Sequence, residues 1–457
     1  MTDRNKTLYK SVLLIAVPIM VQNGFTNFVN LLDNIMVGRL GTEPMSGVAI
    51  VNELIFVYNL CIFGGFSGAG IFTAQYFGKG DAEGVRNTFR FKLILGVALT
   101  ATAVLVFLTL GDTLMGFYLN ESPDGGDLAL ALMHGRSYLR IMLLGLPAFA
   151  LVQSYAGTLR ECGQTVVPMK AGITAVLVNL VLNYILIYGK LGFPALGVRG
   201  AAIATVISRY VEATIVLTWA HRKNSGFPIA NTLYRTLRVP KRLVSKIMKK
   251  GMILLVNEAL WSFGTTMLIQ CYSMRGLNAL AGVNMANTLV NLFKVVFLAF
   301  GNSVGIIIGG LLGAGKLEEA RATDGKIMVF SVIISCFVGL VMISISGLFP
   351  KLYNTSAAAK SIATSIIIVS GVCMPIDAFK NATYFTLRSG GRTFITFLFD
   401  GFSAVAVSLP VAFILSRFTS ASVLWIFISV QIAGLVKGIA GFILVKKGVW
   451  VRNIVVD

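Results

Sequence analysis

Residues 45–54 read MSGVAIVNEL, and 235 positions later residues 280–289 read LAGVNMANTL. The same offset continues without a gap and pairs Gly70 with Gly305, Gly78 with Gly313, Gly80 with Gly315, Glu83 with Glu318 and Arg86 with Arg321. A second echo, at an offset of 228, pairs GTLRECGQT (157–165) with FTLRSGGRT (385–393). Self-similarity at a fixed offset indicates an internal repeat, which is common in transporters. The chain is therefore predicted to consist of two related halves.

The amino-acid composition indicates that the two halves are surrounded by lipid and not by water. Of the 457 residues, 56% are hydrophobic and 13% are charged, whereas soluble domains carry about 25% charged residues. Too little polar surface remains to cover a water-soluble fold, so we expect a lipid bilayer to cover the apolar side chains. The net charge of +20 would suggest nucleic acid in a soluble protein. The basic residues lie mostly between apolar stretches, as in cytoplasmic loops, so we expect no nucleic-acid partner.

The apolar stretches are long enough to cross a membrane as helices, which takes about 20 residues each. They lack the period-2 alternation of a transmembrane barrel. The sequence therefore predicts an all-α membrane fold. Its twelve spans are expected near 11–37, 48–74, 91–117, 133–158, 166–190, 198–221, 247–274, 280–309, 327–349, 359–386, 394–416 and 421–445.

The distribution of Lys and Arg predicts the orientation. With the N-terminus in the cytoplasm, twenty-six Lys and Arg residues fall on the cytoplasmic side. Eight fall on the other side: Arg39, Arg136, Lys190, Arg199, Arg275, Lys351, Lys360 and Arg417. The positive-inside rule then places both termini in the cytoplasm of a multi-pass inner-membrane protein. An acidic loop with Glu121, Asp124 and Asp127 falls outside.

The repeat and the topology together predict two lobes. Residues 1–221 form an N-terminal six-helix lobe, 222–246 a basic cytoplasmic linker, and 247–457 a C-terminal six-helix lobe. An even number of helices per half sends both halves into the membrane in the same direction. The pseudo-symmetry axis is therefore expected along the membrane normal, with a central cavity between the two lobes.

Three motifs, in their order and spacing, resemble the multidrug and toxic compound extrusion (MATE) family of the MOP superfamily, and its norfloxacin-exporter-like bacterial branch. They are LLDNIMVGRLG at 31–41, the repeated LRxxGxT at 159–165 and 387–393, and GVRGAAIATVIS at 197–208. The similarity extends over essentially the whole chain. It implies a secondary antiporter that couples H⁺ or Na⁺ entry to the expulsion of organic, often cationic compounds.

An acidic residue in the first span draws attention, because intramembrane carboxylates are costly. Asp33 follows a polar stripe that includes Gln22 and Asn30, and Pro18 is expected to bend the helix. In the fifth span Asn179 and Asn183 lie one turn apart and offer oxygens suited to a hard cation. The family resemblance implies that these asparagines, Asp33 and Thr205 form the N-lobe cation-coupling site. The alternative is that Asp33 is simply solvated at the interface near Arg39.

The C-terminal half carries its own acids. The family resemblance implies that Glu258 in the seventh span and Asp377 in the tenth form a C-lobe cation-coupling site, with Na⁺ possible here or at Asp33. The alternative is a buried ion pair of Lys294 with Glu258 or Asp377 that only ties helices together. Polar residues on the same helix faces, together with Gln22 and Asn30, are expected to line the cavity: Asn287, Asn291, Lys294, Asn381 and Tyr384.

The predicted mechanism is alternating access. Cation and drug binding compete or are coupled through the acids, while the helices bend at Pro18 and Pro375. The second hypothesis is a lipid-linked precursor flippase of the same superfamily, and the third is a non-transporting membrane binding protein. An enzyme is not expected, because zinc ligands are too few and no phosphate-binding loop is present. We expect small organic substrates, a surrounding lipid bilayer, a monomer, and no cofactor beyond the coupling ion.

Overall fold

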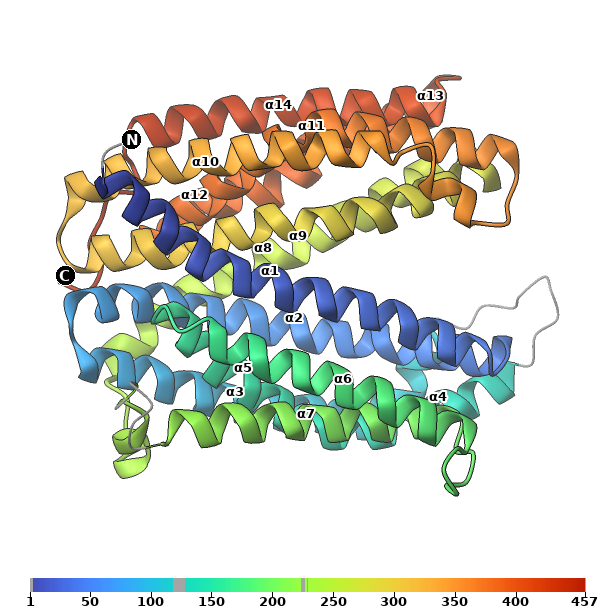
Figure 1. Ribbon diagram of the computed structural model, residues 1–457, viewed down its shortest axis with the longest axis horizontal. Coiled ribbons are helices and arrows are strands. Elements are labelled where there is room, and N and C mark those ends of the chain that lie inside the picture. Colours follow the sequence, from blue (N-terminus) through green and yellow to red (C-terminus); the bar gives the residue numbers. More distant parts are fainter. Residues whose placement is uncertain (1–2, 118–127, 223–226, 228, 457) are drawn as a thin grey trace. The chain divides into compact units, whose positions relative to one another are not determined.

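The computed structural model describes residues 3–117, 128–222, 227 and 229–456, and within these ranges all regular elements are helical (Figure 1). Among the described residues, twelve helices are long and apolar enough to cross a membrane. The prediction of an all-α membrane fold with twelve spans is confirmed. The predicted acidic loop with Glu121, Asp124 and Asp127 lies outside the described residues, as do linker residues 223–226 and 228.

Six of the spans lie in the first half of the chain. They are α1 (Asp3–Gly38), α2 (Thr42–Lys79), α3 (Ala82–Gly116), the composite span of α4 (Leu128–Met142), η1 (Leu143–Gly145) and α5 (Leu146–Glu161), α6 (Val166–Tyr188) and α7 (Val198–Ala220). A short 3₁₀ helix, η2 (Ala230–Arg235), follows them.

The remaining spans lie in the second half. They are α8 (Lys241–Ser273), α9 (Leu277–Gly313), α10 (Leu317–Ser344), α11 (Ala357–Ser389), the composite span of α12 (Thr393–Phe397), η4 (Leu398–Phe402), η5 (Ala404–Ser408) and α13 (Leu409–Phe418), and α14 (Val423–Lys446). A 3₁₀ helix, η3 (Phe349–Leu352), precedes α11. Both η4 and η5 are π-helical, a geometry found often at functional sites.

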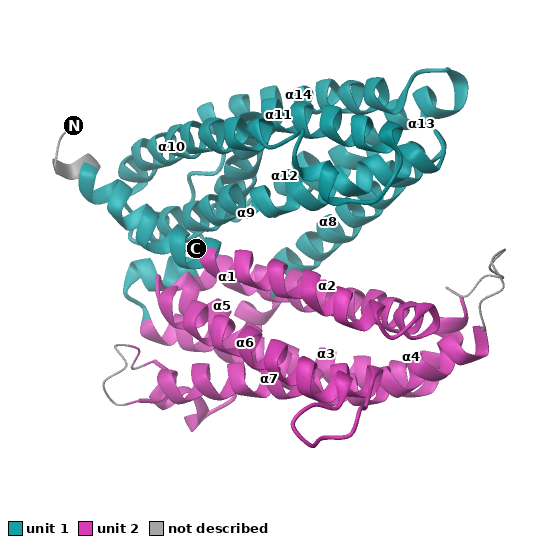
Figure 2. Ribbon diagram, turned by 45° about the vertical axis from the view of Figure 1, so that its right-hand side comes forward, with its two compact units in different colours: residues 1–20, 74–81, 247–457 teal, residues 21–73, 82–246 magenta. Residues whose placement is uncertain are grey.

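The chain divides into two compact units, shown in different colours in Figure 2. Unit 2 comprises residues 21–73 and 82–246, and its core includes buried Tyr58, Ile62 and Tyr138. Small residues allow its helices to approach closely: a Cβ added at Gly47 in α2 would lie 2.5 Å from the carbonyl oxygen of Ala131 in α4.

Unit 1 comprises residues 1–20, 74–81 and 247–457. The first turns of α1 belong to it because Val12 and Ala16 are buried in one cluster with Phe300 of α9. The end of α2 belongs to it through Gln75, whose side-chain amide donates to the carbonyl oxygen of Ser389 at 2.9 Å. Both α1 and α2 therefore pass from one unit into the other, and α1 does so two residues after Pro18.

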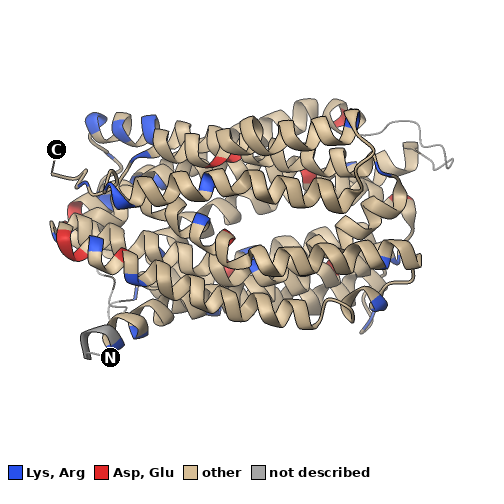
Figure 3. Cartoon of the chain, turned by 90° about the horizontal axis from the view of Figure 1, so that it is seen from above, with Lys and Arg blue, Asp and Glu red and all other residues tan. Residues whose placement is uncertain are grey.

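Charged residues are sparse along the helices. In Figure 3 the Lys and Arg residues gather near helix ends, and few lie along helix length. Large apolar side chains such as Leu105 and Leu108 of α3 are about two-thirds exposed, at 64% and 65%. Exposed apolar surface of this kind requires an apolar solvent, as a bilayer provides.

Candidate functional site

Asp33 of α1 meets the two asparagines of α6 in unit 2, although the residues are some 150 positions apart. The amide nitrogen of Asn183 donates to Oδ1 of Asp33 at 2.7 Å and faces Oδ1 of Asn179 at 3.2 Å. Asn179 in turn lies 3.3 Å from the hydroxyl of Thr205 on α7. The structure thus brings together the four residues predicted for the N-lobe site, which we call the Asp33 cluster.

The amide of Asn179 can face Asp33 in two ways. One atom of the Asn179 amide, either its nitrogen or its oxygen, faces Asp33 and lies 2.9 Å from Oδ2 and 3.2 Å from Oδ1 of that residue. With nitrogen at this end, the amide donates to the carboxylate. With oxygen there, the amide and carboxylate oxygens approach this closely only when a proton or a small cation lies between them. Because both asparagines are buried, at 6% and 1% exposed, water does not replace either arrangement freely.

An additional oxygen is available in the same cluster. In the part of the chain that the structure describes, Oδ1 of Asn183 is buried and has no hydrogen-bond partner. Carboxylate, amide and hydroxyl oxygens are the ligands that hard cations such as Na⁺ prefer. The Asp33 cluster therefore has the donor set to exchange a proton or to bind a small cation.

Gln22, predicted to line the cavity, instead lies buried near the start of unit 2. Its Oε1 accepts a hydrogen bond of 2.9 Å from Arg160, the arginine of the first LRxxGxT motif. Gly172 of α6 leaves room for it, since a Cβ there would lie 2.5 Å from Nε2 of Gln22. Asn30 is exposed and does not belong to the Asp33 cluster. The contact made by Arg160 was not foreseen from its position at a helix end.

In unit 1, Glu258 of α8 belongs to a second polar network. Its Oε1 accepts a hydrogen bond of 2.9 Å from the hydroxyl of Tyr384 and one of 3.3 Å from the amide of Asn257. The same amide lies 3.1 Å from Oδ2 of Asp400 in η4. Oδ1 of Asp400 is paired with Lys437 of α14 at 2.5 Å. We call these residues the Glu258 network.

Asp377 is not part of this network. Its Oδ1 is paired with Lys380, one turn further along α11, at 2.6 Å. Lys294 of α9 is half-buried. The structure thus brings Glu258 together with Tyr384 and Asp400, and it brings Asp377 together with Lys380.

The other predicted cavity residues lie on α9 and α11. Asn287 is half-buried and Asn291 is exposed. Asn381 packs against Gly301, where an added Cβ would meet its Oδ1. Sequence reasoning missed Asp400 and Lys437, although each is an isolated charge in an apolar span and could have been found by that signal alone.

Lys92 and Asp324 are fully buried charged residues outside these clusters. In unit 2, Lys92 of α3 is fully buried and forms an ion pair with Glu161, while its Nζ lies 3.2 Å from the hydroxyl of Thr158. In unit 1, Asp324 of α10 is fully buried, and its Oδ1 accepts a hydrogen bond of 2.6 Å from Thr386. Within the described residues, Oδ2 of Asp324 has no partner.

Twelve apolar helices with carboxylates held inside them define a polytopic membrane protein of the transporter class. The comparisons with known proteins narrow this class. The family model described as MatE matches residues 18–185 and 253–414. The chain belongs to the MATE family of multidrug efflux transporters, as the sequence motifs predicted, and it is a NorM-like member.

Named relatives match nearly the full length of the chain. A probable multidrug resistance protein NorM of Thermotoga maritima is 27% identical over 419 residues, which cover 90% of this chain and 86% of the relative. A probable multidrug resistance protein YoeA of Bacillus subtilis is 25% identical over 434 residues, covering 92% and 90%. An outward-facing MATE transporter structure, 22% identical, superimposes with a TM-score of 0.86 and covers 98% of both chains, so the fold is shared.

Proposed function

We propose that the protein is a secondary multidrug efflux transporter that exchanges H⁺ or Na⁺ for organic, often cationic compounds by alternating access. The observation that carries this proposal is the close approach of Asn179 and Asn183 to the carboxyl group of Asp33. The relatives named as multidrug resistance proteins support the substrate class. The protein acts as a multi-pass inner-membrane monomer with both termini in the cytoplasm.

The Asp33 cluster is suited to coupling because its hydrogen bonds depend on the cation. An ionised Asp33 accepts from both asparagines, whereas a protonated or Na⁺-bound Asp33 permits the Asn179 oxygen to face it. Turning the Asn179 amide also changes its contact with Thr205 on α7. Occupancy by one small ion therefore alters the contacts among α1, α6 and α7.

The course of α1 gives this change a route to the rest of the protein. Asp33 lies in the part of α1 that belongs to unit 2, while the first turns of α1 are packed into unit 1. Pro18 removes one backbone hydrogen bond just before the helix passes from one unit to the other. A bend at Pro18 is the step that connects cation binding with a change of conformation. Pro375 in α11 is the corresponding candidate in unit 1.

The Glu258 network is a second candidate for cation coupling. Its two carboxylates are joined through Asn257, and Lys437 supplies one positive charge to Asp400. This leaves Glu258 with neutral hydrogen-bond donors from Tyr384 and Asn257. Glu258 is therefore the group in this network that is free to take up a transported cation, whereas Asp400 is held by the lysine.

Transport in proteoliposomes tests the proposal, with a pH gradient and a Na⁺ gradient imposed separately. We expect Asp33→Asn to lower gradient-driven dye efflux by about tenfold or more, the effect of losing one charged hydrogen-bonded group. The matched control is Asp112→Asn, which removes an exposed carboxylate of unit 2 and is expected to change efflux by less than about twofold.

The remaining variants assign the coupling site. If Asp33→Asn retains efflux and Glu258→Gln abolishes it, coupling belongs to the Glu258 network and not to the Asp33 cluster. Gradient-driven efflux that persists when Asp33, Glu258 and Asp377 are all replaced by amides would refute cation coupling through these carboxylates.

A further inference from the structure

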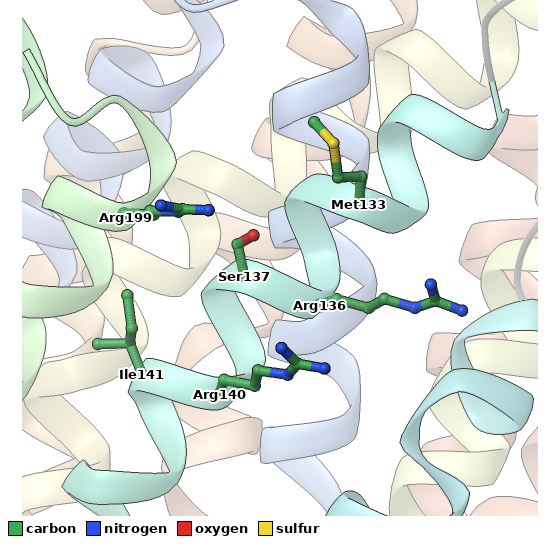
Figure 4. A pocket seen from close by; sticks show the side chains of 6 residues that line it. All are labelled: Met133, Arg136, Ser137, Arg140, Ile141 and Arg199. Atoms are coloured by element: carbon green, nitrogen blue, oxygen red, sulfur yellow. The ribbon is translucent and has the colours of Figure 1, made fainter.

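A pocket in unit 2 lies between the first turns of α7 and the middle of α4, and nothing in the proposed transport cycle uses it. Its volume is about 460 Å³. Figure 4 shows the residues that line it: Met133, Arg136, Ser137, Arg140, Ile141 and Arg199. We call it the arginine pocket, because three of these six side chains are arginines and none is acidic.

Two of the three guanidinium groups are available to a ligand. Arg136 is held by Asp112, whose Oδ1 lies 2.6 Å from its Nε. Among the residues that the structure describes, the side chains of Arg140 and Arg199 have neither an ion-pair nor a hydrogen-bond partner, and both are exposed. In Figure 4 the side chain of Arg199 reaches from α7 toward Ser137 on α4. The pocket therefore presents two unneutralised guanidinium groups from two helices beside a hydroxyl donor.

The depth of the pocket matches the headgroup region of a bilayer. Arg140 and Arg160 are 20 residues apart on one span, which is about 30 Å of helix and equals the thickness of the hydrocarbon core. The proposed orientation places Arg160 on the cytoplasmic side, so we expect Arg140 near the opposite boundary of the hydrocarbon core. Met133 and Ile141 add apolar lining, and Leu144, 63% exposed, continues the apolar surface deeper along the same span.

We propose that the arginine pocket binds the phosphate group of an anionic phospholipid whose acyl chains run along the apolar surface that begins at Ile141. Guanidinium groups match phosphate oxygens with paired hydrogen bonds. A free phosphate ion shares this chemistry, but it would leave the apolar lining without a partner. The lipid therefore fits both the polar and the apolar residues of the pocket.

Native mass spectrometry of the full-length, delipidated protein tests the proposal with phosphatidylglycerol, phosphatidylcholine and inorganic phosphate as probes. We expect retention of phosphatidylglycerol to exceed that of phosphatidylcholine. The double variant Arg140→Gln/Arg199→Gln should weaken phosphatidylglycerol binding by about tenfold, as expected for the loss of charged hydrogen bonds. Arg39→Gln/Lys190→Gln is the matched control, because it removes two exposed positive charges near helix ends of the same unit, outside the pocket.

Each outcome decides between defined alternatives. Equal loss in the pocket and control variants would show nonspecific charge attraction and overturn the proposal. Binding of inorganic phosphate without preference for phosphatidylglycerol over phosphatidylcholine would overturn the assignment to lipid. Amide replacements at Glu121, Asp124 and Asp127, the acids that precede α4 in the sequence, should leave lipid retention unchanged. Increased retention in that variant would mean that the chain's own carboxylates compete for the pocket, and it would also overturn the proposal.

Discussion

Thr158 and Thr386 occupy equivalent positions of the sequence repeat, yet they are bonded to groups of opposite charge. Thr158 lies beside the ammonium group of Lys92, while Thr386 donates to the carboxyl group of Asp324. Lys92 has a second partner in Glu161. Both halves of the repeat therefore have a threonine at the same position of the helix. The neighbouring helix, α3 in unit 2 and α10 in unit 1, determines whether this threonine contacts a positive or a negative group.

The space around the two threonines explains how opposite charges fit one framework. In unit 2, Gly70 leaves room for Glu161, and a Cβ added at Gly157 would lie 3.9 Å from Nζ of Lys92. In unit 1 the residue equivalent to Gly157 is Phe385, whose ring packs against Gly301 and lies 3.3 Å from the place of a Cβ on Gly305. Glycines hold open the volume for an ion pair in one unit, and an aromatic ring fills similar volume in the other.

Energetically the two sites differ in how they treat a buried charge. Removing one partner of a buried ion pair leaves the other without compensation, which costs several kcal/mol. A buried carboxyl group that has one hydrogen bond and no cationic partner contributes less electrostatic stabilisation, so replacing it costs less stability. We therefore expect the stability of the Lys92 site in unit 2 to depend on its ion pair. The stability of the Asp324 site in unit 1 should depend on its one hydrogen bond.

The largest expected effect is that of Lys92→Met, which keeps the length of the side chain and leaves Glu161 without its cation. We expect a loss of about 3–5 kcal/mol, seen as a fall of about 3–5 °C in the thermal unfolding midpoint of the detergent-purified protein. Lys316→Met is the control, because Lys316 is 60% exposed and its pair with Glu319 contributes under about 1 kcal/mol. Equal shifts for both variants would contradict the importance of the buried pair.

An intermediate effect is expected when the threonines are replaced by valine of similar shape. Thr386→Val removes a hydrogen bond from Asp324 and should cost about 2 kcal/mol, or about 2 °C in the unfolding midpoint. Thr158→Val should cost about half as much, because Lys92 keeps Glu161. A larger shift for Thr158→Val would reverse the comparison between the two units.

The smallest effect is expected for Asp324→Asn. The amide has the shape of the carboxyl group, and its oxygen still accepts from Thr386, so stability should change by less than about 1 kcal/mol. Glu161→Gln makes the matching change in unit 2 and should cost about 3 kcal/mol, because it leaves Lys92 buried without a counterion. Thermal unfolding of the two variants side by side measures the difference, and a loss of several kcal/mol in Asp324→Asn would show that Asp324 depends on its charge.

The two units also differ in how much of their candidate cation site could be predicted from the sequence. Asn179 and Asn183 were recognisable because they are one turn apart on a single helix, and the family motifs connected them with Asp33 and Thr205. In the second half the motifs pointed to Glu258 and Asp377. The structure instead places Asp400, which lies in the π-helical turn η4, beside Glu258 through Asn257.

The sequence by itself determined the membrane class, the twelve helices and the two-fold repeat, because hydropathy, helix length and a fixed offset are local properties that need no knowledge of packing. It also determined which polar residues share a face of one helix, since that depends only on the helical period. The tertiary structure alone decided which helices face each other: Asp400 with Lys437, Arg160 with Gln22, and the first turns of α1 with unit 1. Partners across helices depend on rotation and close approach at small residues, and these follow from the packing of the whole unit.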